Sequence, residues 1–488
     1  MTAKGESAML TGVERAAARR RLRRCGPGAA DAPRPELATG TDTLDEISHI
    51  VVLMMENHSY DNYLGMLAGH GDGLPLGPDG RPLPTNPAAD GTPVHLRHFT
   101  GTRQYPGVPA QSWNASHIQW DGGACTGFVR SVEQTKPGLD ASVPMTYWTE
   151  HDLPFYYGLA RTFPLATRWF SSCLGPTFPN RRFLIAGTAH GLIDDFPFSM
   201  IDRPASGTIF DLLDAHGISW VNYHQLSTVK IRWRRLAHAR GLGILRAAGS
   251  LLASFFPQLI PAITSKLQVT ADLFPLGFLR SVNHLRSIDQ FWDDVRTGTL
   301  PAVSLVDPDF RSGSEENPQD ISVGEQFAAK VVNAVMAGPG WPRTLLIWLY
   351  DEHGGYYDHV PPPAAEPPDD VPGGNPLRRF PVLRLLRFTP LGRTIDADDS
   401  GPGRYDRLGF RVPAVFVSPY ARPGHVTGRT YDHTSILRII ERKWNLPPLT
   451  RRDAGAADPL DDMLDLAAPP AFATPPALPE PGQPSAAH

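Results

Sequence analysis

The chain has 488 residues but only three cysteines, Cys25, Cys125 and Cys173. An odd number leaves at least one cysteine unpaired in a monomer, so a disulfide framework is excluded as the basis of the fold. The chain also lacks an excess of either charge, with 46 Lys and Arg against 50 Asp and Glu. This balance argues against a surface built to coat nucleic acid, and we expect no nucleic-acid partner.

Long hydrophobic runs are missing as well. The most apolar stretch, residues 241–263, is interrupted by Arg246, Pro257 and Pro261, which excludes a simple transmembrane helix. Four of the five residues 20–24 are arginine, but residues 25–45 contain no apolar core of a leader peptide. We therefore predict a disordered basic arm over residues 1–45 and a cytoplasmic or peripheral-membrane location.

What the chain does contain is a set of short, buried-type strands. The candidates are residues 47–55, 218–222, 301–306, 344–350 and 412–417. They are apolar and rich in β-branched residues without clean alternation, which is typical of strands covered on both faces. Helical patterns, such as residues 323–337 and 433–444, lie between them. The alternation predicts an α/β sandwich.

Polar residues follow two of these strands directly. Glu56 and Asn57 come after the first, and Asp351 and Glu352 come after residues 344–350. Strand ends of an α/β sheet are where ligands usually bind, and carboxylate and amide oxygens are hard ligands. We predict that these oxygens converge on one cation.

Residues 173–188 place small and turn-forming residues before a helix-compatible stretch, with Thr177 at the helix entrance. Unpaired N–H groups and the positive end of the helix dipole favour a negatively charged oxygen and an incoming phosphate there. Thr177 is therefore a candidate nucleophile. The alternative is that Thr177 only caps the helix.

Several motifs occur together and in order. They are Glu-Asn-x-Ser-Tyr-Asp from residue 56, Gly-Pro-Thr-x-Pro-Asn-Arg from residue 175, Tyr-Asp-Glu-x-Gly-Gly-x-Tyr-Asp-His from residue 350, and residues 117–123, 152–157, 411–420 and 432–435. With them the chain resembles the bacterial phospholipase C and acid phosphatase phosphoesterase family over residues 47–446. The resemblance implies an alkaline phosphatase-like fold, a three-layer α/β/α sandwich with a mixed, mainly parallel central sheet.

The resemblance also implies a metal site and a mechanism. The implied ligands of one divalent ion are Glu56, Asn57, Asp351, Glu352 and the Thr177 hydroxyl. Three carboxylates, an amide and a hydroxyl suit Mg, Ca, Mn or Zn, and the sequence does not choose among them. Metal binding would lower the pKa of the hydroxyl, which would attack phosphorus and form a phosphothreonine that water then hydrolyses.

Charge on the transferred phosphoryl group needs hydrogen-bond donors. The candidates in the matching motifs are His117, Asn180, Arg181, His359 and His433. His224 is a weaker addition, and His58 and His353 are doubtful because each can point away from the metal. For any one histidine, the alternative is an ordinary structural role.

One position departs from the family pattern. Asn317 stands where a Glu-His-Pro motif usually places histidine, and an amide cannot supply a titratable proton. Three functions remain open: a phospholipase C-like phosphodiesterase acting on a glycerophospholipid, an acid phosphatase-type enzyme acting on soluble monoesters, and a non-catalytic phosphoester-binding protein. The retained metal ligands and Thr177 favour an enzyme.

The predicted catalytic domain covers residues 46–450, followed by a Pro- and Ala-rich tail, residues 451–488, whose end after residue 467 has the composition of a disordered segment. Residues 228–278 are unusual because basic residues and Trp233 precede an apolar stretch. This insertion could contact an anionic lipid surface. The alternative is an insertion that packs on the core or on a second subunit.

Overall fold

An eight-stranded mixed sheet forms the centre of the molecule. The structure is a computed structural model that describes residues 31–67, 69–195, 204–225, 270–273, 282–374 and 403–483. In order across the sheet, the strands are β13 (Val426–Thr427), β6 (Leu165–Ala166), β12 (Ala414–Val417), β11 (Thr344–Tyr350), β1 (His49–Met55), β10 (Val303–Val306), β8 (Trp220–His224) and β9 (Leu285–Ser287). The five strands from β11 to β9 are parallel, whereas β12 runs antiparallel to β11. The predicted fold class is confirmed.

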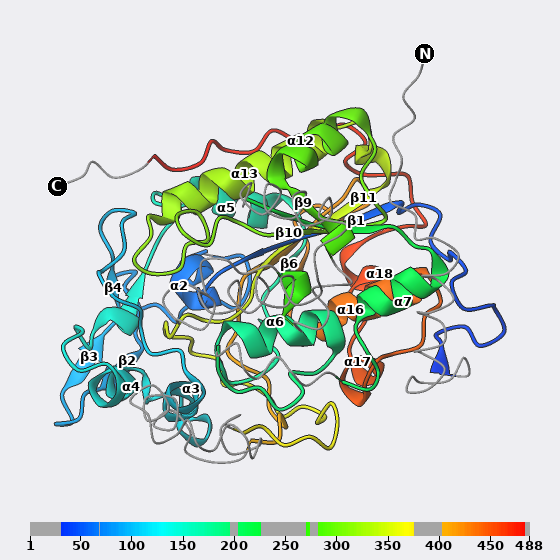
Figure 1. Cartoon of the computed structure of the whole chain (residues 1–488). Coiled ribbons are helices and arrows are strands. Elements are labelled where there is room, and N and C mark those ends of the chain that lie inside the picture. The colour runs from blue at the N-terminus through cyan, green and yellow to red at the C-terminus, as the bar shows by residue number, and fades with distance from the viewer. Residues whose placement is uncertain are drawn as a thin grey trace, which may run out of the picture.

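Helices cover both faces of this sheet (Figure 1). One layer contains α5 (Pro154–Thr162), α12 (Ile288–Thr297) and α13 (Ile321–Ala337), and the other contains α6 (Thr177–Ala186), α7 (Ile209–His216) and α16 (Thr434–Lys443). Because helices lie on both sides, every residue of β11 is buried, and so is β1 apart from its first residue. This explains why the predicted strands show no alternation of polar and apolar residues.

Smaller elements complete the described chain. The helices are α2 (Tyr60–Leu64), α3 (Trp113–Trp120), α4 (Phe128–Thr135), α17 (Arg451–Gly455) and α18 (Leu460–Met463). The strand pairs are β2 (Thr85–Pro87) with β3 (Pro93–His95), β4 (Arg97–His98) with β5 (Thr146–Tyr147), and β7 (Trp169–Phe170) with β14 (Tyr431–Asp432). Helices α3 and α4 and strands β2 to β4 lie together beyond one end of the main sheet (Figure 1).

The C-terminal tail is not disordered where the structure describes it. Residues 468–483 run along the helical layer that contains α13 (Figure 1). The Phe472 ring lies 4.7 Å from that of Phe163, and the Phe472 carbonyl accepts from Trp341 Nε1 at 2.9 Å. Further on, Gly482 N donates to Glu325 Oε2 at 2.6 Å. Composition predicted disorder because it does not reveal these few anchoring contacts.

The other end of the chain shows a similar pattern. Of the basic arm, residues 1–30 lie outside the described residues, but residues 31–45 contact the end of α16. Asn445 Nδ2 donates to Arg34 O at 2.8 Å, and Lys443 Nζ pairs with Asp42 Oδ1 at 2.7 Å. The part of the arm next to β1 is therefore ordered, contrary to the prediction of disorder.

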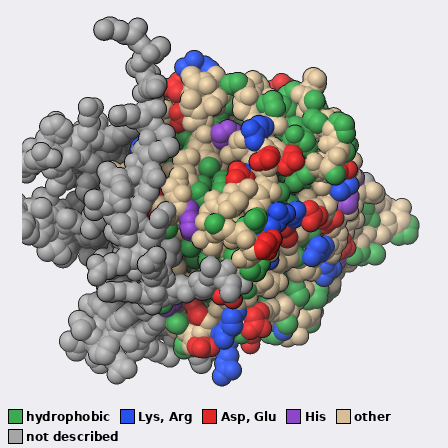
Figure 2. Space-filling model, turned by 90° about the vertical axis from the view of Figure 1, so that its right-hand side faces the viewer, with side chains coloured by type: hydrophobic (Ala, Val, Ile, Leu, Met, Phe, Trp, Pro, Cys, Tyr) green, Lys and Arg blue, Asp and Glu red, His purple; other side chains and the backbone are tan. Residues whose placement is uncertain are grey.

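Almost all of the insertion predicted at residues 228–278 lies outside the described residues, and only residues 270–273 of it are placed. No helix within the described ranges is long and apolar enough to span a membrane. On the face shown in Figure 2, basic and acidic side chains are interspersed where side chains are described. Cys125 and Cys173 are buried and free.

The packing of the tail can be tested with Phe472→Ala. Removal of this half-buried ring from its contact with Phe163 should lower the free energy of unfolding by about 1–2 kcal/mol, less than for a fully buried phenylalanine. Urea denaturation measures the change, with Leu83→Ala, at a side chain that is 60% exposed, as the control. Equal stability of the two variants would show that the tail does not pack on the body.

Candidate active site

Three carboxylates follow three neighbouring parallel strands. Glu56, Asp351 and Asp307 are the first residues after β1, β11 and β10. Met55 at the end of β1 is in register with Tyr350 at the end of β11, so Glu56 and Asp351 lie at the same level of the sheet. All three side chains are buried. The predicted convergence of the first two strand ends is thus observed, with a third carboxylate added.

Asn57 joins this group because the backbone turns sharply after β1. It has φ 72°, and its N–H donates to Asp351 Oδ1 at 3.2 Å. Gly354 packs directly against this turn, since a Cβ at Gly354 would lie 1.9 Å from Asn57 O. Only glycine permits so close an approach, and Gly354 also has φ 66°. The glycine pair of the second motif therefore lets the two motif loops touch.

Glu352 is completely buried beside Asp351. Its Oε2 accepts from Gly354 N at 2.7 Å and lies 3.2 Å from His353 Nδ1. Burial raises the pKa of Glu352 well above its usual range, and the neighbouring Asp351 charge adds to this. Burial likewise raises the pKa of Glu56, although the Arg181 charge opposes the shift. Each of these buried carboxyl groups must therefore either be protonated or lie beside a cation.

Thr177 is the first residue of α6, and Pro176 is the N-cap. Thr177 is therefore not the N-cap, and its role as the nucleophile stays a prediction. Its Oγ1 lies 3.4 Å from Asn57 Oδ1, so the hydroxyl faces the strand-end group. Asn180 fixes the preceding turn, because its Nδ2 donates to Gly175 O at 2.8 Å and its Oδ1 accepts from Cys173 N at 3.0 Å. The side chain of Asn180 is thus committed to presenting Thr177.

Arg181 lies one turn further along α6 and is fully buried. Its nitrogens pair with Asp351 Oδ2 at 2.9 Å, Asp307 Oδ1 at 3.3 Å and Glu56 Oε1 at 3.6 Å. One guanidinium therefore connects all three strand-end carboxylates. Each of its nitrogens is engaged with protein oxygens, so a direct contact of Arg181 with substrate stays a prediction.

The donor set fits a divalent cation. Glu56, Asp351 and Glu352 are three buried carboxylates, and Arg181 is the cation paired with two of them. One terminal atom of the Asn57 amide lies 2.9 Å from Glu352 Oε1 and 3.3 Å from Asp351 Oδ1. If nitrogen occupies that position it donates to both carboxylates. If oxygen occupies it, three oxygens converge, and either a proton on Glu352 or a bound cation must lie between them.

A second acidic group could hold a metal by distance alone, because one ligand atom each of Asp61, Asp358 and His359 lies within 4.8 Å of the others. Arg411, however, pairs with Asp61 Oδ1 and with Asp358 Oδ1 at 2.8 Å each. His359 Nδ1 lies 2.7 Å from Asp61 Oδ2. Burial lowers the pKa of His359, yet Asp61 and Asp358 together raise it above its ordinary value. Arg411 and His359 face the two carboxylates of this cluster, whereas Arg181 alone faces the strand-end carboxylates, so the set around Asn57 keeps more negative charge for a cation.

Two further predicted donors, His433 and His117, have different environments. His433 Nε2 lies 2.7 Å from the Asp351 carbonyl and its Nδ1 accepts from Trp169, so this neutral ring supports the strand end. Burial lowers the pKa of both His433 and His117. In His117, Nδ1 faces Trp113 O at 2.7 Å, and Nε2 has no hydrogen-bond partner in the described part of the chain. A Cβ at Gly175 would touch Trp113, which brings the helix of His117 next to the turn before Thr177.

The doubtful histidines serve other contacts. His58 directs its two nitrogens to Asn62 Oδ1 at 2.7 Å and to Glu315 O at 3.1 Å, away from the metal candidates. His353 bridges Glu352 and Gln119 Oε1, the latter at 2.7 Å. Burial lowers the pKa of each histidine to about 3. His224 is buried at the end of β8.

The loop that carries Asn317 lies against the site. Ser314 O accepts from Glu56 N at 3.0 Å, and Tyr356 OH donates to Asn317 Oδ1 at 2.9 Å. Asn317 Nδ2 is buried and has no partner among the described residues. The departure from histidine therefore leaves a neutral amide with one unused donor.

The same loop contains a buried carboxylate surrounded by tyrosines. Glu315 accepts from Tyr63 OH at 2.8 Å, from Tyr156 OH at 2.6 Å and from Tyr350 OH. Because Tyr350 directly precedes Asp351, this cage fixes the loop to the end of β11. Burial raises the pKa of Glu315 to about 8.

Sequence reasoning missed three residues of the site: Asp307, Thr270 and Asp195. Asp307 directly follows the predicted strand 301–306, so the strand-end rule could have found it. Thr270 Oγ1 bonds Asp307 Oδ1 at 2.5 Å, and no motif marks it. Asp195 Oδ1 accepts from Phe178 N at 2.7 Å, which places a carboxylate at the start of α6 beside Thr177. Burial raises the pKa of Asp195 to about 8.

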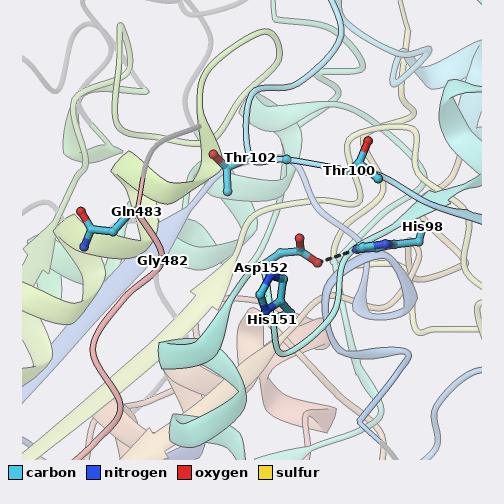
Figure 3. A pocket seen from close by; sticks show the side chains of 8 residues that line it. His98, Thr100, Thr102, His151, Asp152, Gly482 and Gln483 are labelled. Atoms are coloured by element: carbon cyan, nitrogen blue, oxygen red, sulfur yellow. Dashed lines mark hydrogen bonds and ion pairs between the residues drawn. The ribbon is translucent and has the colours of Figure 1, made fainter. Parts of the chain in front are cut away.

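A cavity of about 340 Å³ lies elsewhere, between residues 98–102, residues 151–152 and the tail (Figure 3). His98 and Asp152 face each other there at 2.7 Å, with Thr100 and His151 beside them (Figure 3). None of the predicted site residues lines this cavity.

Glu315→Gln tests the buried carboxylate. A folded-state pKa near 8, against an ordinary value of 4.5, means that the folded protein keeps a proton which the unfolded chain releases. Its contribution to stability is fully present below pH 4.5 and is lost as the pH rises toward 8. The variant does not titrate, so its decline in unfolding free energy from pH 5 to pH 8 should be smaller by roughly 2–4 kcal/mol.

Urea denaturation at the two pH values measures this decline, with Glu36→Gln at an exposed position as the control. A decline as steep in Glu315→Gln as in the unsubstituted protein would contradict a protonated Glu315.

Comparisons with known proteins agree with the motifs. The Phosphoesterase family matches residues 47–447. The hemolytic phospholipase C of Pseudomonas aeruginosa is 27% identical over 461 residues, which are 88% of this chain and 58% of the relative. Phospholipase C B of Mycobacterium tuberculosis is 31% identical over 457 residues, or 88% and 79%. Non-specific phospholipase C6 of Arabidopsis thaliana is 28% identical over 457 residues, or 89% and 75%.

The chain thus spans little more than half the length of the Pseudomonas relative. The family match, in contrast, covers the chain from just before β1 to just after α16, including every strand that positions the site. This protein belongs to the Phosphoesterase family.

Proposed function

We propose that the protein is a metal-dependent phosphoester hydrolase of the phospholipase C type, which cleaves a phosphodiester of a glycerophospholipid through Thr177. The observation that carries the proposal is the position of the Thr177 hydroxyl, at the first residue of α6 and 3.4 Å from Asn57 Oδ1. A binding protein would need the oxygens but not a hydroxyl aimed at them. The relatives named above are all phospholipases C, which supports the substrate class.

Glu56, Asn57, Asp351, Glu352 and Thr177 would hold one divalent cation. A bound cation would supply positive charge that lowers the pKa of the Thr177 hydroxyl and withdraws charge from the phosphoryl group. The residues of the chain do the rest. The positive end of the α6 dipole favours a negative phosphoryl oxygen beside Thr177, although Phe178 N already donates to Asp195 Oδ1 and Pro179 has no N–H.

In the first step, Thr177 Oγ1 forms a bond to phosphorus while the bond from phosphorus to the glycerol oxygen breaks. The diacylglycerol leaves with a proton, and the phosphorylated headgroup remains on Thr177. In the second step, water attacks phosphorus, the bond to Oγ1 breaks, and Thr177 recovers its proton as the headgroup phosphate departs.

The donors around Thr177 favour a diester over a monoester. A monoester dianion carries one more charged oxygen and needs more donors. Arg181, Asn180 and His433 are committed to protein oxygens, whereas His117 Nε2 and Asn317 Nδ2 have no hydrogen-bond partner among the described residues. The donor count thus supports a phosphodiesterase, and a phosphomonoesterase is the competing outcome.

Thr177→Ala tests the nucleophile. Metal-stripped protein is supplied with Mg, Ca, Mn or Zn and assayed on p-nitrophenyl phosphorylcholine and p-nitrophenyl phosphate. Thr177→Ala should lose roughly 10³-fold or more of the turnover, because it removes the attacking oxygen. Thr177→Ser keeps a hydroxyl and is the matched control, which should retain a large part of the rate.

Preference for the monoester would move the assignment to a phosphatase with the same nucleophile. Equal turnover by Thr177→Ala and the unsubstituted protein would overturn Thr177 as the nucleophile. Tight metal binding with no turnover on either ester would favour the non-catalytic alternative.

Asn317→His tests the departure from the family pattern. Histidine can protonate the leaving oxygen, so the variant should hydrolyse esters with poor leaving groups roughly tenfold faster or more, and lose this gain as the pH rises through the histidine pKa. Esters of p-nitrophenol leave without a proton and should change little. Asn317→Leu is the control of similar size, and equal gains on both ester types would contradict a proton-donating position.

A further inference from the structure

We propose that Thr270 and Asp307 are positioning residues that hold Arg181 on a single oxygen of Asp351 and thereby leave the other oxygen of Asp351 free to face Asn57. The proposal rests on the proposed function for what the site binds, but its geometry does not depend on that. It begins with the arrangement of the Arg181 guanidinium, which is 0% exposed.

The nitrogens of Arg181 point to different partners. Nε donates to Asp351 Oδ2 at 2.9 Å. Nη1 donates to Thr270 Oγ1 at 2.9 Å and to Asp307 Oδ1 at 3.3 Å. Nη2 points to the carbonyls of Met54 and Met55 at 3.4 and 3.3 Å. Arg181 thus contacts Asp351 through one nitrogen only.

Asp307 is held so firmly that it cannot turn toward the metal candidates. Its Oδ1 accepts from Thr270 Oγ1 at 2.5 Å and its Oδ2 accepts from Thr270 N at 3.0 Å. Asn222 Nδ2 donates to Oδ2 at 2.9 Å. Both oxygens are therefore engaged on the side of β10 and β8. Within the described ranges, the link from Asp307 to the predicted metal ligands runs through Arg181.

Thr270 completes the link with a single hydroxyl. Its one proton goes to Asp307 Oδ1, and its lone pair accepts from Arg181 Nη1. Thr270 is 1% exposed, and Ala271 N donates to Asn222 Oδ1 at 2.9 Å, which fixes the backbone here. The hydroxyl is therefore placed to define the direction of Nη1.

The orientation of the guanidinium matters because arginine and carboxylate groups prefer a bidentate ion pair. Without the anchor on Nη1, the whole guanidinium could turn, so that Nε and Nη2, which lie on one edge, engage both oxygens of Asp351 in place of the Met54 and Met55 carbonyls. Asp351 Oδ1 now accepts from Asn57 N at 3.2 Å and from Glu352 N at 2.8 Å, so it lies within the predicted ligand group. The anchor keeps a fixed positive charge from competing with a cation for Oδ1.

The test compares Thr270→Val, which removes the hydroxyl, with Thr270→Ser, which keeps it. Thr146→Val is the matched control, because Thr146 is 2% exposed and its hydroxyl bonds Val143 O at 2.8 Å. Asp307→Asn is a second variant that retains the shape but removes the charge. Circular dichroism and thermal melting verify that each protein is folded.

The first readout needs neither metal nor substrate. Arginine-selective ¹⁵N labelling detects slowly exchanging Nε–H groups, and Arg181→Lys assigns the signal of Arg181. In the metal-free protein, Thr270→Val should change the chemical shift of this signal and raise its exchange rate roughly tenfold or more, while Thr270→Ser and Thr146→Val preserve both. An unchanged signal in folded Thr270→Val and in Asp307→Asn would overturn the proposal.

The second readout is calorimetric titration with Mn²⁺. Loss of a supporting contact behind a ligand typically weakens metal binding roughly tenfold to a hundredfold, and Thr270→Val should fall in this range with Thr270→Ser near the unsubstituted protein. Turnover should fall through kcat at saturating metal with little change in KM. Metal affinity and kcat equal to those of the unsubstituted protein would also overturn the proposal.

Different results would contradict the proposed function and the positioning role of Thr270 and Asp307. If the unsubstituted protein binds no divalent metal and hydrolyses no ester, the proposed function fails, whereas the Arg181 Nε–H signal still decides whether Thr270 and Asp307 position the guanidinium.

Discussion

The site depends on one buried guanidinium. Arg181 carries the positive charge that allows Glu56, Asp307 and Asp351 to end three neighbouring strands inside the protein. Burial of a charge is costly unless it is paired, and loss of one partner from a buried pair leaves an uncompensated charge. Since Arg181 lies on the same helix as Thr177, one turn along it, the pairing also fixes the hydroxyl relative to the strand ends. The ion pairs that offset the charge of the carboxylates therefore also fix the geometry of the site.

The loop of residues 314–318 holds the opposite side of the site. Glu315 accepts hydrogen bonds from three tyrosine hydroxyls, one of them from Tyr350 at the end of β11. The carbonyl of Ser314 accepts a hydrogen bond from the N–H of Glu56. Together, the loop and Arg181 restrain β1 and β11 from two directions. Asn317 lies within this loop and its Oδ1 accepts from Tyr356 OH, so a neutral amide occupies this position.

Two histidines from matching motifs illustrate how similar residues acquire different roles. His433 supports the carbonyl of Asp351, whereas His359 belongs to a separate cluster with Asp61, Asp358 and Arg411. In that cluster Arg411 and His359 face two carboxylates, whereas in the group around Asn57 the single charge of Arg181 faces three carboxylates, with Glu352 buried beside them. The difference in charge balance explains why a cation is expected at only one of two acidic groups that both follow β1 and β11.

The sequence by itself determined the α/β sandwich, the five main strands and the residues that end β1 and β11, because buried strands need continuous apolar runs and the motifs follow them directly. It also placed Thr177 at the start of a helix. Only the tertiary structure decided that Arg181 joins three carboxylates, that Thr270 and Asp307 anchor it, and that Phe472 packs the tail against Phe163. These partners are separated by 37 to more than 300 residues, and local sequence patterns report the conformation of a segment but not which distant side chain it meets.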